Sequence, residues 1–158
     1  MSAERNRLVN IVIDEGSLAA ATADAEHERR VAIFDLLEGN VFALAECDEG
    51  PYALTLSVVD AKLVLSVRGE NGAEDRAIIL SLTPFRKVIK DYFLVCDSYH
   101  TAIRSATPSQ IEAIDMGRRS LHNEGSDLLT QRLAGKVSLD HDTARRLFTL
   151  ICALHVRT

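Results

Sequence analysis

The hydrophobic positions between residues 52 and 82 follow a period of two. In residues 52–58 the even positions are bulky and the odd ones small or polar, and over 62–68 leucine and valine alternate with smaller or charged residues. This alternation is typical of strands with one buried and one solvated face. Asn71-Gly72 suits a type I′ turn, after which residues 76–82 return as a further strand. The pattern predicts an antiparallel β-meander.

The residues before the meander predict two more strands and one helix. The β-branched residues of 8–13 indicate a first strand, and residues 41–45 a short second one. Between them, Asp24 is expected to cap a helix that runs to about Leu37 and stops at Gly39. On this helix, Ile33, Phe34 and Leu37 are expected to share one face.

From residue 83 onward the period changes from 2 to 3.6, which predicts helices. Thr83-Pro84 and Thr107-Pro108 share one start signal, a hydroxyl N-cap followed by proline at the first helical position. Gln110 stands three residues after Thr107, as in a capping box. Two helices are therefore expected to begin at these threonines.

Two further helices are expected near the end of the chain. Ser126 is expected to open a short helix that Gly135 closes, and either Ser138 or Asp140 opens the last one. The predicted fold class is α+β, with an N-terminal antiparallel sheet and one early helix covered by a C-terminal block of about four helices. We expect a single domain over residues 1–158, sheet-rich in 1–82 and helical in 83–158.

The composition is that of a folded protein. The chain has 158 residues, 47% hydrophobic and 26% charged, so it carries enough apolar surface for a core. It contains no run of about 18 apolar residues that would cross a membrane, and its first residues lack the apolar stretch of a secretory signal. We therefore expect a cytoplasmic protein with no membrane partner.

Charge is distributed unevenly along the chain. The formal net charge of −5 argues against general nucleic-acid binding. Residues 1–80 hold 15 acidic and 7 basic residues, whereas residues 81–158 hold 8 acidic and 11 basic ones. An anionic ligand or an acidic partner is therefore expected to prefer the second half.

The three cysteines are odd in number and widely spaced, which fits a reducing compartment. Cys96 and Cys152 stand among apolar residues and are expected to be core thiols, while the acidic neighbours of Cys47 disfavour its thiolate. No spacing of His, Cys, Asp or Glu predicts a metal site, and no motif predicts a cofactor or an activated nucleophile.

A polar stripe is predicted on the helix after Pro84. At 100° per residue its polar members fall within about 80° of the helix circumference, and Phe93 lies inside the same arc. The stripe consists of Arg86, Lys90, Asp97, His100 and Arg104. Two interpretations stay open: a solvated outer face, or a groove in which Phe93 and the cations bind a planar or anionic ligand.

The next helix offers a second set of candidates. Arg118, Arg119 and His122 lie near Asp115 on one face, and Asn123 and Glu124 follow in a polar connector that ends at Ser126. If a helix begins at Ser126, its free N–H groups would favour an anion. The alternative is an ordinary capped turn, with positive φ at Gly125 and Ser126 as the cap.

Several of these stretches also carry a family resemblance. Residues 81–92 (SLTPFRKVIKDY), 106–119 (ATPSQIEAIDMGRR), 121–126 (LHNEGS) and 143–151 (TARRLFTLI) resemble the uncharacterised bacterial protein family (UPF) 0262. The resemblance covers nearly the whole chain. It implies a small cytoplasmic bacterial protein, and it carries no catalytic residue or cofactor over to this sequence.

Three functions stay open from the sequence. The favoured one is a non-enzymatic binding or regulatory module that holds an anionic small molecule or an acidic partner on its cationic helical part. It requires guanidinium and imidazole groups of neighbouring helices to converge on one cavity. The alternatives are an enzyme with acid–base groups among His100, His122, Asp97 and Glu124, and an oligomeric scaffold joined through Phe93 or a sheet edge.

Overall fold

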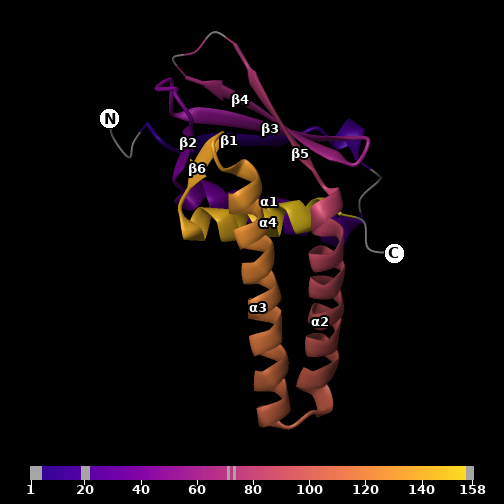
Figure 1. The fold of residues 1–158 in the computed structure, drawn as a ribbon. Helices are drawn as coiled ribbons and strands as arrows, with labels where there is room; N and C mark the ends of the chain where they lie inside the picture. Colours follow the sequence, from indigo (N-terminus) through magenta and orange to yellow (C-terminus); the bar gives the residue numbers. More distant parts are fainter. Residues whose placement is uncertain (1–4, 19–21, 71, 73, 156–158) are drawn as a thin grey trace.

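A computed structural model describes residues 5–18, 22–70, 72 and 74–155. A sheet forms one layer, helices α1 (Ala23–Glu38) and α4 (His141–Leu154) lie against one of its faces, and α2 (Arg86–Ser105) and α3 (Pro108–Leu133) extend side by side away from it (Figure 1). Helices and strands thus combine in the predicted α+β architecture, with an N-terminal sheet and a helical C-terminal block.

The main sheet has the strand order β1-β3-β4-β5, formed by β1 (Leu8–Ile13), β3 (Tyr52–Val59), β4 (Lys62–Gly69) and β5 (Arg76–Ser81). Strands β3, β4 and β5 pair antiparallel, which confirms the meander. The first strand pairs parallel to β3, so the complete sheet is mixed and not antiparallel throughout. The parallel pairing is possible because α1 lies between β1 and β3 in the chain and supplies the crossover.

Two short strands form a second sheet. They are β2 (Phe42–Leu44), which the sequence predicted, and β6 (Val137–Leu139), which it did not. Ser138 therefore belongs to a strand, and the side chain of Asp140 caps α4 by accepting from the Thr143 N–H. The expected Asn71-Gly72 turn lies partly outside the described residues.

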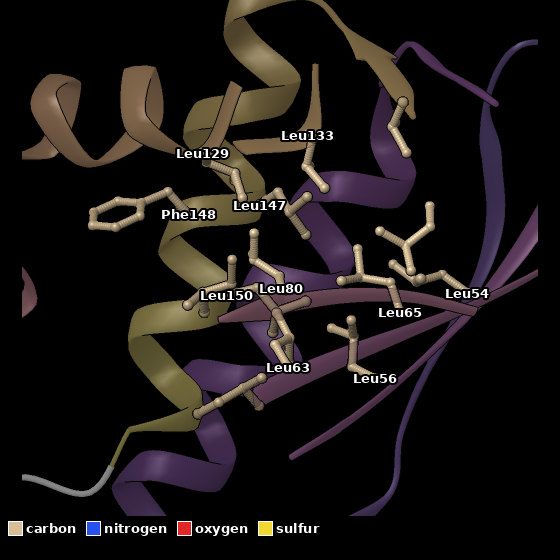
Figure 2. Packing of buried hydrophobic residues seen from close by; sticks show 14 of the residues in the cluster. Leu54, Leu56, Leu63, Leu65, Leu80, Leu129, Leu133, Leu147, Phe148 and Leu150 are labelled. Carbon is tan, nitrogen blue, oxygen red and sulfur yellow. The ribbon is translucent and has the colours of Figure 1, made fainter. Parts of the chain in front are cut away.

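The core lies between the main sheet and the helices. Leucines on the inward face of β3, β4 and β5 pack toward α4 and the C-terminal end of α3 (Figure 2). Helix α4 is buried along most of its circumference, including Leu147, Phe148 and Leu150, because it lies between the sheet and α3. Because of this central position, α4 packs against both the sheet-rich part and the helical part of the chain.

The N-cap of helix α1 lies two residues before the predicted one. Thr22, and not Asp24, is the N-cap residue, and Gly39 ends the helix as expected. The buried positions are Arg29, Ala32 and Leu36, whereas Phe34 is 62% exposed and Leu37 is also exposed. Of the three apolar residues predicted to share one face, Ile33 packs partly against the core, whereas Phe34 and Leu37 are exposed to solvent.

Helix α3 is continuous from Pro108 to Leu133, so the predicted helix start at Ser126 is wrong. Gly125 is helical here, and the Ser126 hydroxyl donates to the His122 carbonyl within the helix, at 2.8 Å, instead of capping a new one. The capping box of Thr107 and Gln110 is confirmed. Thr83 is the first residue of only a short 3-10 turn (Thr83–Phe85), and Leu82 occupies the N-cap position without a side-chain cap hydrogen bond.

Within the described part of the chain, none of the helices combines the length and the apolar character that crossing a bilayer requires.

Candidate functional site

The polar stripe of α2 does not enclose a cavity. Arg86, Lys90, Asp97, His100 and Arg104 are all exposed and follow one side of the helix. None of them lines the pockets described below. The structure therefore does not bring these groups together with those of α3 in any of these pockets; they are exposed along α2, which extends beside α3 away from the sheet (Figure 1).

Arg118 and Arg119 of α3 are both held by the carboxylate of Asp115, one turn earlier on the same helix. Hydrogen bonds from the two guanidinium groups lower the pKa of Asp115. Arg118 also lies over the Tyr99 ring of α2, with its guanidinium carbon 5.3 Å from the ring centroid. Arg118 thus links α3 to α2, whereas Arg119 is paired within α3.

His122 is a core residue, with 8% of its surface exposed. Its Nε2 lies 2.7 Å from the hydroxyl of Thr149, and that hydroxyl donates to the Arg145 carbonyl at 3.0 Å. Nε2 therefore carries the proton and donates to Thr149. The imidazole packs against the rings of Tyr92 and Phe148, at centroid distances of 5.4 and 5.3 Å.

Burial lowers the pKa of His122 to about 4, and the nearby charges of Arg145 and Arg118 add to the shift. The ring is therefore neutral at pH 7. Its Nδ1 is buried and has no hydrogen-bond partner among the described residues. His100, in contrast, is exposed and contacts the ring of Tyr99, so these two imidazoles do not form an acid–base pair.

Asn123 and Glu124 line the same shallow groove of about 520 Å³, together with Asp127 and Gln131 of the same helix. The Asn123 side-chain oxygen also accepts from the guanidinium of Arg145, which joins α3 to α4. Glu124 is exposed. The sequence-predicted candidates are thus divided among an exposed stripe, an ion-paired cluster, a buried ring and this groove.

A further arrangement of polar and aromatic groups is one that sequence analysis did not find. Helices α1, α2 and α4 meet around a pocket of about 380 Å³, which we call the three-helix pocket. The wall from α1 consists of His27, Glu28, Val31, Ala32 and Asp35. Tyr92, Phe93 and Cys96 of α2 and Thr149, Cys152 and Ala153 of α4 complete it.

The chemistry of the three-helix pocket is mainly apolar with a charged rim. Phe93 is half-buried in its wall, which corrects the expectation of an exposed ring within the α2 stripe. Burial raises the pKa of Tyr92 to about 12, with further contributions from Cys96 and Cys152, so its phenol stays protonated. Glu28 and Asp35 belong to the lining and are exposed to solvent.

The sequence held one signal of this pocket. On α1, the lining residues recur at the helical spacing of three, four and seven positions, which places them on one face. Their partners on α2 and α4 are more than fifty residues away in the chain, and only the tertiary packing brings them together. Among the described residues, no three potential metal ligands are grouped together.

Comparison with known proteins gives one consistent result. Residues 5–157 match the profile of the Uncharacterised protein family (UPF0262). A relative in Rhizobium meliloti is 61% identical over 158 residues, covering 99% of each chain. Relatives in Hyphomonas neptunium and Caulobacter vibrioides are each 62% identical, over 95% and 96% of this chain and 93% and 94% of their own. No solved structure matches the chain.

Proposed function

This chain belongs to the uncharacterised bacterial protein family UPF0262, and we propose that it is a binding module whose ligand site is the three-helix pocket. The observation that carries this proposal is the pocket itself. A concave site with apolar and aromatic walls and a few polar groups is the usual form of a ligand site, and about 380 Å³ lies within the range of such sites.

The pocket supports binding more directly than catalysis. The partly buried phenol of Tyr92 is protonated, and the nearby His122 is neutral, with its Nε2–H group donating a hydrogen bond to Thr149. A general base must be within reach of the proton that it removes, and the ionised groups of this site, Glu28 and Asp35, stand at its exposed rim. We also place the module in the cytoplasm, which the odd number and wide spacing of its cysteines support.

Cysteine footprinting tests this proposal. Cys96 lies in the pocket and Cys47 lies outside it, and both are half-buried, so Cys47 is an internal control. The neutral dye Nile red should bind with increased fluorescence and slow the alkylation of Cys96 by iodoacetamide several-fold, while Cys47 reacts at an unchanged rate. Absence of binding, or equal protection at both cysteines, would overturn the proposal.

A second candidate function rests on the α2 stripe. Arg86, Lys90 and Arg104 are exposed and form no ion pair with another described residue, so they are available to an acidic partner. Binding of poly-glutamate, weakened by added salt and by the Arg86→Ala/Arg104→Ala double substitution, would support this candidate. The control is Arg132→Ala, which removes an exposed cation from α3. A thermal-shift screen with ATP, phosphate and citrate, on the same variants, tests whether small anions bind to the stripe.

A further inference from the structure

We propose that the three-helix pocket and the outer face of α1 together dock a basic segment of a partner protein, which inserts an apolar side chain into the pocket. This inference rests on the proposed function and adds the class of partner. It follows from three observations: an apolar surface that continues beyond the pocket, carboxylates at the pocket rim, and the acidic character of α1.

The apolar surface begins at Val31, which lines the pocket and is 44% exposed. Phe34 follows three residues later, which places it next to Val31 on the helix surface, and it is 62% exposed. Single exposed apolar residues are ordinary, but a large exposed ring that borders a pocket of the same helix is typical of an interaction surface. A ligand confined to the pocket would leave this ring in water, whereas a peptide segment would cover both.

The charges around this surface are mostly acidic, although Arg30 is an exposed cation of the same helix. Glu28 and Asp35 line the pocket two helical turns apart, about 10 Å along the axis. Neither forms an ion pair with another described residue. The other exposed charged residues of α1 are Asp24, Glu26, Arg30 and Glu38.

Arg29 does not offset these charges at the surface, because it is buried and paired with Glu15. Complementary charge across an interface selects partners and speeds association. The side chains that fit here are lysines and arginines placed on either side of an apolar residue, which is a common pattern in segments that lie in an apolar groove.

Fluorescence anisotropy with labelled peptides tests this inference. The probes are a short peptide in which lysines flank leucines and one tryptophan, and a matched peptide with glutamines in place of the lysines. The basic peptide should bind at least ten-fold more tightly at low salt, and it should protect Cys96 from iodoacetamide. Glu28→Gln/Asp35→Asn and Phe34→Ser should each weaken its binding several-fold.

Matched controls separate docking from general attraction. The control for Glu28→Gln/Asp35→Asn is Glu70→Gln/Glu74→Gln, which likewise removes two negative charges, here from the β4–β5 hairpin. The control for Phe34→Ser is Ile79→Ser, which removes a similarly exposed apolar side chain from β5. Equal weakening by a variant and its control would overturn the inference, as would equal binding of the neutral peptide. A concentration-dependent dimer in light scattering that Phe34→Ser abolishes would also overturn it, because a second copy would then cover this face.

The failures of the two proposals are distinguishable. If Nile red protects Cys96 but no basic peptide does, the partner class is wrong and the binding pocket stands. If neither Nile red nor the basic peptide protects Cys96, both proposals fall.

Discussion

The ring of Phe148 on α4 lies directly against the backbone of Gly125 on α3. A β-carbon at position 125 would stand 2.1 Å from Cζ of that ring, which is too close for any side chain. Phe148 is fully buried and cannot move away without disturbing the core. The glycine is therefore needed for close packing of two helices, and not for the positive φ of a turn.

Gly125→Ala is expected to destabilise the protein in spite of the better helix preference of alanine. Overpacking of a core costs about 1–3 kcal/mol, against a gain of at most about 1 kcal/mol from replacing a helical glycine. Gly117→Ala is the matched control, because its β-carbon would meet only Val95, at 3.9 Å. Urea unfolding should show a loss for the first variant and no loss for the second. A stabilised Gly125→Ala protein would contradict the packing described here.

The buried state of His122 predicts a pH-dependent stability. Its pKa falls from 6.5 to about 4 on folding, so between these values the unfolded chain binds more protons than the folded one. The contribution of His122 to stability is thus fully present above pH 6.5 and is lost as the pH falls to 4. The free energy of unfolding that is lost in this way amounts to roughly 3 kcal/mol.

His122→Phe isolates this contribution. Phenylalanine fills the site beside Tyr92 and Phe148 without a titrating group, so unfolding free energies measured between pH 7 and 4 should decline less steeply in the variant than in the wild type. His141→Gln, at an exposed position of α4, should keep the wild-type slope. Parallel profiles for the wild type and His122→Phe would refute the assignment.

Arg29 provides a third prediction, because this buried cation of α1 binds a backbone carbonyl at the C-terminal end of α4. Its Nε donates to the carbonyl of Ala153 at 3.0 Å, and that carbonyl lies in the last turn of α4, where no intrahelical partner follows. Arg29→Met keeps the aliphatic length but leaves this carbonyl unsatisfied, which should cost about 1–3 kcal/mol.

Glu15→Gln separates the two bonds of Arg29. The Glu15 carboxylate pairs with Arg29 at 3.0 Å but is 64% exposed, so its loss should cost less than about 1 kcal/mol. Guanidinium chloride unfolding of both variants measures the difference. A loss for Glu15→Gln as large as that for Arg29→Met would show that the ion pair, and not the cap of α4, is what Arg29 supplies.

The parts of the fold that were predicted from the sequence are those set by local chemistry. The alternation in 52–58 and 62–68 identified β3 and β4, because one face of each strand is buried and the other is not. Gly39 correctly marked the end of α1, and the two residues of the capping box marked the start of α3. Each of these signals lies within a few residues of the feature that it predicts.

The errors arise where distant contacts override local preference. Gly125-Ser126 has the composition of a helix boundary, and only the Phe148 ring explains why a glycine stands inside a helix. No local pattern indicates that Arg29 is buried, because its hydrogen-bond acceptor is a carbonyl 124 residues away. The three-helix pocket was missed for the same reason, since its walls come from three separate segments.

The last prediction concerns two threonines with the same sequence signal and different structures. Thr107 precedes proline and accepts the Gln110 N–H at 3.2 Å, while Thr83 precedes proline but lies inside a 3-10 turn whose N-cap position is Leu82. Loss of an N-cap hydrogen bond costs about 1 kcal/mol. Thr107→Ala should therefore lower the free energy of unfolding by about that amount, and Thr83→Ala, at an exposed position, should change it by less than about 0.5 kcal/mol. Equal effects in urea unfolding would mean that proline alone, and not the threonine hydroxyl, determines where α3 begins.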